Sequence, residues 1–211
     1  NKKIEIACFN LESALIAEGK TELRLLPKIL HKIHGRTLGQ EKIALIPLGG
    51  VDNTKKTLSI LKSMDIPCKA IVDLDFVFKG AINQQYILNT HPDIVAIKDI
   101  FSNLATIHNF LLDQEGFPKK GGRLTASQAY EVLAQQSSAQ PHIENLHEIF
   151  KKKGIWVWTK GAIEPHLNIP SNKKDEATWS HFNTQIDQIG IAHLESLDYE
   201  NLKKLTDWVI E

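Results

Sequence analysis

Short apolar runs that alternate with helical segments constrain the fold of this chain more than any other feature. The first run, Leu11 to Ala17, leads through a glycine into a segment with apolar residues at helical spacing. Further strand-like runs follow at Lys42 to Leu48 and Cys68 to Val72, with a helical pattern from Thr54 to Met64 between them. Such alternation requires crossover connections, and it therefore predicts a parallel sheet with helices on both faces.

The second half of the chain departs from this alternation. Its helical patterns cover Phe101 to Gln114, Ala126 to Gln136 and Ile143 to Lys153, before the apolar run Ile155 to Thr159 returns to the sheet. We therefore expect one α/β domain over residues 1–211, in the following parts: a parallel-sheet core at about 11–77 and 154–167, a mainly helical insertion at about 78–153, and a helical C-terminal tail at 174–211.

Charge and composition exclude several classes of protein. Lysine plus arginine balance aspartate plus glutamate at 25 each, so any contact with nucleic acid must be local. No apolar stretch approaches the roughly 20 residues that span a bilayer, and no signal peptide is visible, which predicts a cytoplasmic protein without a membrane partner. Cys8 and Cys68 lack the spacing of a zinc site, and we interpret both as packing residues.

Acidic residues follow three of the predicted strands. Glu18 comes after the first strand, Asp73 and Asp75 come after the third, and Glu164 follows the last. Glu22 stands one helical turn beyond Glu18. Asp73 and Asp75 point to the same side if the strand stays extended through the residue between them. Because carboxyl ends of parallel strands meet at one edge, these acids could hold one or two Mg²⁺ or Mn²⁺ ions.

Each acid also has a purely structural interpretation. Glu22 suits the first turn of a helix because of the helix dipole, and Asp73 or Asp75 could cap a turn. Glu164 could form a surface ion pair with Lys160, four residues earlier. The joint occurrence of acids at three strand ends favours a cation site, beside which Lys160 could offset negative charge in a phosphoryl-transfer transition state.

Two other phosphate motifs compete with this interpretation. Gly19-Lys20-Thr21 lacks the earlier glycine of a phosphate-binding loop, since Ala14 stands at that position. Asp73-Leu74-Asp75 after an apolar strand resembles the nucleophile motif of haloacid dehalogenase-like phosphatases, which would use Asp73 as the nucleophile. That motif normally follows the first strand, whereas here it follows the third.

The acidic motifs together resemble a Toprim domain, the metal-binding module of topoisomerases, primases and several nucleases. Ile16-Ala17-Glu18-Gly19 and Asp73-Leu74-Asp75 carry this resemblance. The segment Glu18 to Glu22 with Leu25-Leu26-Pro27, and Lys160 to Glu164 near the end, resemble more specifically the C-terminal nuclease region of OLD-family (overcoming lysogenization defect) endonucleases. The resemblance implies a Toprim-like α/β fold.

The resemblance also implies a function and a set of roles. Glu18, Glu22, Asp73, Asp75 and Glu164 would bind metal, and Lys160 and Glu18 would be catalytic. The reaction would be metal-dependent cleavage or nicking of DNA, in the context of phage defence. An ATPase domain would precede this segment in a longer parent chain, as the absent initial methionine also indicates, and that chain could form a homodimer. The non-catalytic alternative is a DNA-docking or dimerising module.

Overall fold

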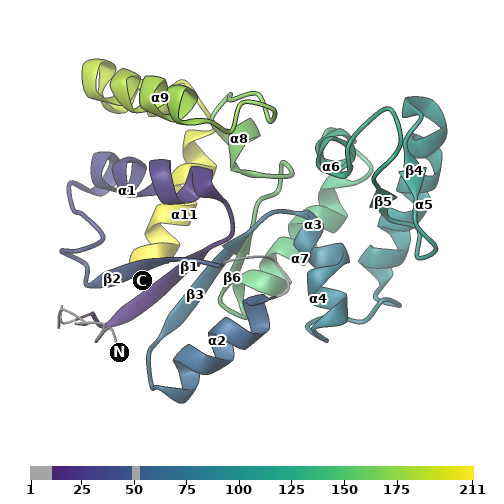
Figure 1. Cartoon of the computed structure of the whole chain (residues 1–211), viewed down its shortest axis with the longest axis horizontal. Helices are drawn as coiled ribbons and strands as arrows, with labels where there is room; N and C mark the ends of the chain where they lie inside the picture. Colours follow the sequence, from purple (N-terminus) through teal and green to yellow (C-terminus); the bar gives the residue numbers. More distant parts are fainter. Residues whose placement is uncertain (1–10, 49–52) are drawn as a thin grey trace, which may run out of the picture.

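The computed structural model describes residues 11–48 and 53–211, and its centre is a sheet of four parallel strands in the order β2-β1-β3-β6 (Figure 1). The strands are β1 (Ser13–Ala17), β2 (Ile43–Pro47), β3 (Cys68–Val72) and β6 (Ile155–Val157). Each lies within the corresponding predicted run. The predicted fold class, a parallel α/β sheet flanked by helices, is therefore confirmed.

The two faces of the sheet support separate hydrophobic cores, because successive side chains of a strand point to opposite faces. Ile16 and Val72 belong to the core beneath α2 (Thr54–Ser63) and α7 (Gln140–Lys151). Leu15 belongs to the other core. The longer helices that contribute to this second core are α1 (Lys20–His34), α9 (Glu176–Ile189) and α11 (Tyr199–Ile210). Both faces are covered, as parallel strands require.

The order of the strands creates a switch point beside β1. The chain passes from β1 to β2 on one side, and then crosses to β3 on the other side of β1. β6 extends the sheet beyond β3. At such a point the connections after neighbouring strands leave in opposite directions, which opens a crevice at the carboxyl ends of the strands.

Within the insertion, the longest helix begins and ends earlier than predicted. This helix, α5, covers Pro92–His108, whereas periodicity predicted a helix from Phe101 to Gln114. His91 caps the helix by accepting the backbone N–H of Asp93, and Asn109 ends it in a left-handed conformation with φ 54°. The last residues of the predicted helix instead enter a short antiparallel ladder, because β4 (Leu111–Leu112) pairs with β5 (Pro118–Lys119).

Several shorter helices complete the described residues: α3 (Asp75–Phe78), α4 (Gly80–Asn83), α6 (Ala126–Ala134), α8 (Ile163–His166) and α10 (Ile191–Glu195). In Figure 1, α5, β4 and β5 form a lobe beside the sheet. Aromatic packing joins that lobe to the core, since Phe101 of α5 packs edge to face against Phe78 of α3. No helix in the described ranges is long and apolar enough to cross a bilayer. Cys68 is half-buried, and Cys8 lies outside the described residues.

Candidate metal centre

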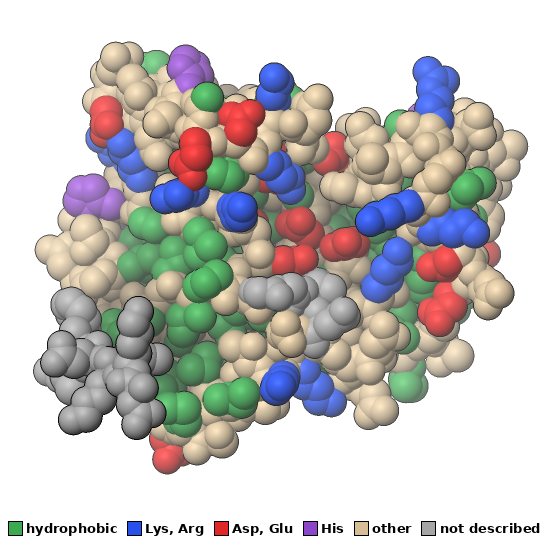
Figure 2. Space-filling model, in the orientation of Figure 1, with side chains coloured by type: hydrophobic (Ala, Val, Ile, Leu, Met, Phe, Trp, Pro, Cys, Tyr) green, Lys and Arg blue, Asp and Glu red, His purple; other side chains and the backbone are tan. Residues whose placement is uncertain are grey.

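Three carboxylates meet at the switch point and form what we call the carboxylate triad: Glu18, Asp73 and Asp75. One oxygen of each lies within 4.8 Å of the others. Glu18 directly follows β1 and Asp73 directly follows β3, so the pairing of these strands places them together. The backbone N–H of Asp73 donates to Oε2 of Glu18 at 3.2 Å. Figure 2 shows acidic side chains gathered near the centre of this molecular face.

Asp75 reaches the triad by a route that the strand pattern did not predict. Leu74 has helical dihedrals, φ −61° and ψ −31°, so the extended geometry ends at Asp73. Asp75 therefore lies in the first turn of α3. The backbone N–H of Leu74 donates to the carbonyl of Gly161 at 2.8 Å, which ties this turn to the loop after β6. A turn, rather than a continuing strand, brings the two aspartates together.

Glu22 and Glu164 form a second group, the buried pair, whose side chains are 2% and 1% exposed. Oε1 of Glu22 accepts the indole N–H of Trp158 at 2.9 Å. Oε1 of Glu164 accepts the hydroxyl of Thr21 at 2.6 Å, and its Oε2 lies 3.1 Å from Nζ of Lys174. Because Glu22 stands in the first turn of α1 and Glu164 in α8, two helix starts converge beside the triad.

The electrostatics of the two groups are linked. Burial, together with the charge of Asp75, raises the pKa of Glu18 from 4.5 to about 8. Burial and the charge of Glu164 raise the pKa of Glu22 to about 7. Burial also raises the pKa of Asp73 well above its usual range, with Glu22 and Glu18 adding to the effect. The ionised acids are therefore unfavourable together unless a cation is present.

A hard divalent cation fits this donor set. The triad offers only carboxylate oxygens, which are the ligands that Mg²⁺ and Mn²⁺ prefer. Oδ1 of Asp75 is buried and accepts no hydrogen bond from the described residues, which leaves one oxygen free for an ion. A bound dication would also favour the ionised acids and so reverse their raised pKa values.

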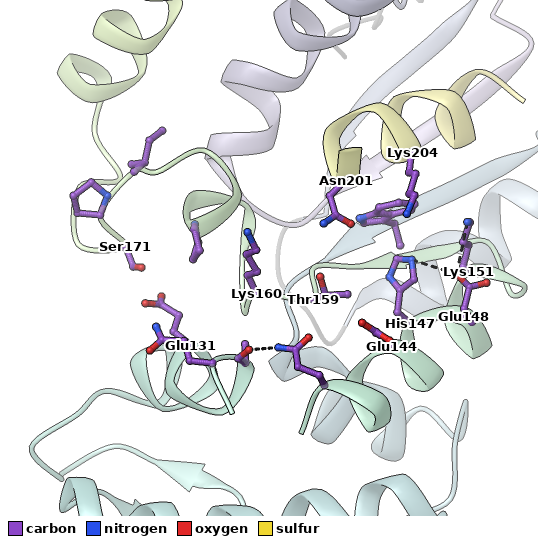
Figure 3. A pocket seen from close by; sticks show the side chains of 17 residues that line it. Glu131, Glu144, His147, Glu148, Lys151, Thr159, Lys160, Ser171, Asn201 and Lys204 are labelled. Atoms are coloured by element: carbon purple, nitrogen blue, oxygen red, sulfur yellow. Dashed lines mark hydrogen bonds and ion pairs between the residues drawn. The ribbon is translucent and has the colours of Figure 1, made fainter. Parts of the chain in front are cut away.

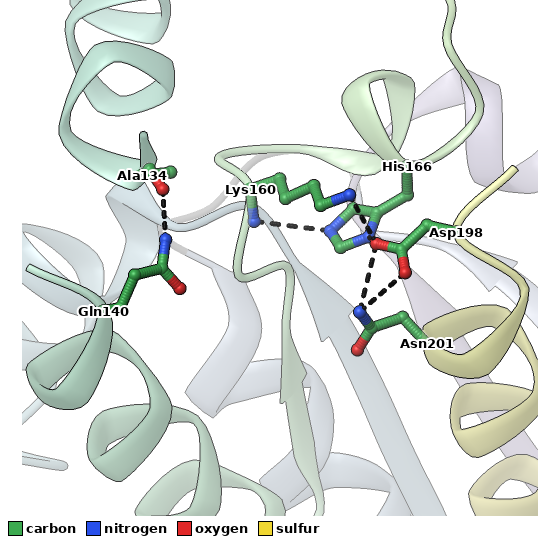
Figure 4. Close-up of polar contacts among 6 residues, drawn as sticks. All are labelled: Ala134, Gln140, Lys160, His166, Asp198 and Asn201. Carbon is green, nitrogen blue, oxygen red and sulfur yellow. Dashed lines mark hydrogen bonds and ion pairs between the residues drawn. The ribbon is translucent and has the colours of Figure 1, made fainter. Parts of the chain in front are cut away.

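Lys160 lies on the rim of the site, where its ammonium pairs with Asp198 (Figure 4). Nζ of Lys160 is 2.7 Å from Oδ2 of Asp198, the oxygen that also contacts Nδ1 of His166 at 2.7 Å. The backbone N–H of Lys160 donates to Nε2 of His166 at 3.3 Å, so the imidazole proton belongs on Nδ1. Asn201 donates to both oxygens of Asp198 at 3.0 Å.

These contacts define a positioning network of Lys160, His166, Asp198 and Asn201. Hydrogen bonds from His166, Lys160 and Asn201 outweigh partial burial and hold the pKa of Asp198 well below its usual range. Burial lowers the pKa of His166, which keeps its ring neutral in the tautomer that the network requires. The predicted surface pair of Lys160 with Glu164 is replaced by these contacts with Asp198, from the loop that precedes α11.

A cleft of about 940 Å³ adjoins Lys160 (Figure 3). Its walls come from α6 and α7 of the insertion on one side, and from the loop after α8 and the start of α11 on the other. Glu131 and Ser171 lie at one end, His147 and Lys204 at the other, and Lys160 lies between them. Among the described residues that line it, Lys160 is the one that the sequence marked as a site residue.

Residues 11–75 match the family model described as "Overcoming lysogenization defect protein-like, TOPRIM domain". The chain carries an OLD-like Toprim domain. Four of the five predicted metal ligands, Glu18, Glu22, Asp73 and Asp75, lie inside the matched segment. Glu164 and Lys160 lie beyond it, and the sheet brings Glu164 back to the Toprim segment through Thr21.

Two individual proteins are similar to this chain. The "Old nuclease" of Escherichia phage P2 is 25% identical over 163 residues, which are 72% of this chain and 26% of that protein. The chain thus spans about a quarter of the length of this relative. The C-terminal region of the OLD protein of Xanthomonas campestris pv. campestris aligns with 94% of this chain and 78% of its own, at a TM-score of 0.40 and 14% identity.

Sequence analysis did not find several residues that contact the candidate metal ligands or Lys160. Trp158 lies in the apolar run Ile155 to Thr159, but a buried indole N–H needs an acceptor, and that rule could have pointed to an acid such as Glu22. His166 has no metal-ligand spacing to another histidine, and nothing in the sequence links it to Asp198 or to Lys160. Lys174 and Thr21 gave no signal, because their roles depend on how α9 packs against α1.

Gly19 provides a test of the buried pair, because a side chain there would collide with Glu22. A Cβ atom at Gly19 would lie 2.3 Å from Oε2 of Glu22, whereas the backbone at φ −96° and ψ 157° suits alanine. We expect Gly19→Ala to displace the Glu22 carboxylate and to weaken Mn²⁺ binding about tenfold, measured by calorimetry.

A matched control exists at Gly39, which is exposed and where an added Cβ would meet Oγ1 of Thr37 at an ordinary 3.8 Å. Gly39→Ala should leave Mn²⁺ affinity unchanged. Equal affinities in the two variants would contradict a role for Glu22 in metal binding.

Proposed function

We propose that this chain is the catalytic part of a metal-dependent endonuclease that cleaves or nicks DNA. The observation that carries the proposal is the convergence of the carboxylate triad and the buried pair at the carboxyl ends of β1, β3 and β6. The family match over residues 11–75 and the likeness to a phage nuclease support the same class of reaction. Five acids of one site are costly to bury without divalent metal.

The roles of the residues follow from their places. Glu18, Asp73 and Asp75 would hold a first Mg²⁺ or Mn²⁺ ion, and Glu22 and Glu164 would complete a second position. When bound, such ions supply Lewis-acid stabilisation of phosphate and lower the pKa of water. Glu18, whose pKa burial raises to about 8, could in its ionised form also accept a proton at Oε1, since Oε2 accepts the N–H of Asp73.

Lys160 would contribute positive charge beside the scissile phosphate. His166 fixes the backbone of Lys160, and Asp198 orients its ammonium toward the rim of the cleft. A lysine held in this way loses less side-chain entropy when it meets a phosphate. His166 and Asp198 are positioning residues in this proposal, because they would act through Lys160.

The remaining parts of the proposal concern the parent protein. The DNA substrate, an ATPase domain in a longer chain, dimerisation through that chain, and a role in phage defence are all inferred from the resemblance to OLD-family proteins. The cytoplasmic location stays a prediction. The balanced charge of the chain means that binding of the DNA backbone would draw on other parts of the protein.

Cleavage of supercoiled plasmid tests the proposal most directly. We expect the chain to nick or linearise plasmid when Mg²⁺ or Mn²⁺ is present, and to lose this activity in EDTA. Folded protein that binds Mn²⁺ but leaves plasmid and single-stranded DNA intact would contradict cleavage by the isolated domain. In that event, turnover of a small phosphate monoester would favour the phosphatase alternative with Asp73 as nucleophile.

Asp198 tests the positioning network. We expect Asp198→Ala to lower the turnover number about tenfold while the KM for DNA and the affinity for Mn²⁺ change little, because Lys160 loses its anchor but the acids keep their places. Loss of an acceptor shared by three donors should also cost about 1–3 kcal/mol of unfolding free energy. Urea denaturation and steady-state plasmid kinetics measure these effects.

Asp207 offers the matched control, because it lies in α11, the helix that begins directly after Asp198, and pairs there with Lys203 at 2.8 Å at the protein surface. Asp207→Ala should change stability by less than about 1 kcal/mol and leave turnover intact. A turnover number that is the same in Asp198→Ala as in the control would refute the positioning role.

A further inference from the structure

We propose that Lys174 acts as a built-in cation for the carboxylate triad and the buried pair. In the absence of metal its ammonium neutralises part of their negative charge, and when a divalent ion binds the ammonium is displaced toward solvent. This inference rests on the proposed metal site, and it adds a competition between a residue of the chain and the metal. It would make metal affinity adjustable by the segment that carries Lys174.

Direct contact places Lys174 at the site. Its Nζ lies 3.1 Å from Oε2 of Glu164, a carboxylate with 1% of its side chain exposed. The Lys174 side chain is itself 42% exposed, so its ammonium sits at the boundary between the buried acids and water. A long flexible side chain in this position can withdraw into solvent without opening the core.

The position of Lys174 is fixed by the way α9 begins. Asp175 caps α9 by accepting the backbone N–H of Thr178 at 2.9 Å. One turn into the helix, the indole N–H of Trp179 donates to Oγ1 of Thr21 at 3.2 Å, and that hydroxyl donates in turn to Glu164. A chain of hydrogen bonds therefore joins the start of α9 to the acid that Lys174 contacts. The lysine is held at the site by the fold.

The positive charge of Lys174 also interacts with acids other than Glu164, the carboxylate that it contacts. Although partial burial lowers the pKa of the ammonium, the charges of Asp73, Glu164 and Glu22 outweigh it and raise that pKa. In return, Lys174 lowers the pKa of every member of the triad and of Glu22. These pKa values remain raised nonetheless, because one ammonium cannot balance the whole group of acids. A dication is still favoured there.

The ammonium and the metal ion must oppose each other. Both are attracted by the same acids, and two positive charges a few ångströms apart repel strongly in a partly buried site. Metal binding therefore weakens the ion pair between Lys174 and Glu164, and removal of the Lys174 ammonium strengthens the binding of metal. By reciprocity, anything that pulls the segment before α9 away from Glu164 would favour the metal-loaded state.

Calorimetry with Mn²⁺ tests the competition, with Lys174→Gln against Lys173→Gln. Lys173 is the adjacent lysine, is exposed, and serves as a control for charge and sequence position. We expect Lys174→Gln to bind Mn²⁺ at least about tenfold more tightly than wild type, and Lys173→Gln to bind within about twofold. Circular dichroism checks that both variants are folded.

A second measurement uses the wild-type chain and so does not depend on the folding of a variant. Brief acetylation of amines, read by mass spectrometry, should modify Lys174 slowly in EDTA and several times faster at saturating Mn²⁺, while Lys173 reacts equally in both. Equal or weaker Mn²⁺ binding by Lys174→Gln, or unchanged acetylation of Lys174, would overturn the inference alone. Absence of Mn²⁺ binding by all three proteins would overturn the metal site as well.

Discussion

Replacement of Asp73 by asparagine is expected to reduce metal-dependent DNA cleavage by about a thousandfold while the protein stays folded. Asp73 is central to the triad, because its carboxylate is one of the three and its backbone N–H donates to the carboxylate of Glu18. Asparagine preserves shape and the backbone contact, but removes the negative charge that a divalent ion needs. The loss should therefore appear in both the affinity for Mn²⁺ and the rate of cleavage.

The metal-free form of this variant should be at least as stable as the wild-type protein, although its activity is lost. Burial and the charges of Glu22 and Glu18 raise the pKa of Asp73, so its ionised form destabilises the metal-free protein. Asp73→Asn should consequently unfold in EDTA at the same urea concentration as wild type or at a higher one. A variant that lost activity because it unfolds would instead unfold at a lower urea concentration than wild type.

Asp65 supplies the matched control for this experiment. It is exposed in the turn before the same strand, and its left-handed backbone, φ 55°, suits asparagine equally well. Asp65→Asn should cleave plasmid at the wild-type rate. Cleavage by Asp73→Asn that matched this control would remove Asp73 from the catalytic site, and with it the basis for treating the triad as a metal centre.

The sheet was predictable because each strand is a continuous apolar run next to a helical pattern. Parallel strands that are buried on both faces must be apolar along their whole length, so their boundaries stand out in the sequence. The sequence of the insertion shows no such contrast between continuous apolar runs and helical patterns. The start of α5 depends on Pro92 and the His91 cap, whereas its apolar residues continue past His108 into β4, and periodicity placed the helix too late.

The triad was predictable for a topological reason. Acids that directly follow neighbouring parallel strands meet wherever those strands pair, whatever the conformation of the intervening loops. Asp75 illustrates both the strength and the limit of this rule. It was expected beside Asp73 because of an extended strand, and it lies there because Leu74 turns into α3.

The contacts of the two lysines could not be predicted. In the sequence Lys160 was paired with Glu164, four residues later, but its ammonium meets Asp198, from the loop that precedes α11. Lys174 reaches Glu164 through the docking of α9 on α1. Such pairs depend on the packing of helices that are distant in sequence, and neither periodicity nor local spacing carries that information.

The stability of the metal-free protein should fall as pH rises, contrary to the behaviour of a protein held by ion pairs. Unfolded Glu18 and Glu22 would titrate near 4.5, whereas the folded protein raises their pKa values to about 8 and about 7. Between these limits the folded state binds more protons than the unfolded state, so the free energy of unfolding decreases with pH. The stabilisation is complete below about pH 4.5 and is lost by about pH 8.

Thermal unfolding in EDTA at about pH 5 and about pH 8 measures this effect. The raised pKa values of Glu18 and Glu22 together span roughly 5 units between these two pH values, and about 1.4 kcal/mol per unit sets an upper limit of about 7 kcal/mol on the loss of stability. A loss of about 3 kcal/mol would already lower Tm by roughly 10 °C. Saturating Mn²⁺ should restore most of the difference at the higher pH, since it favours the ionised acids. Glu18→Gln should flatten the dependence, while Glu12→Gln, at an exposed position, should leave it intact. A Tm that rose with pH in EDTA would mean that the acids are already neutralised by groups of the chain, and that no cation is needed to complete the site.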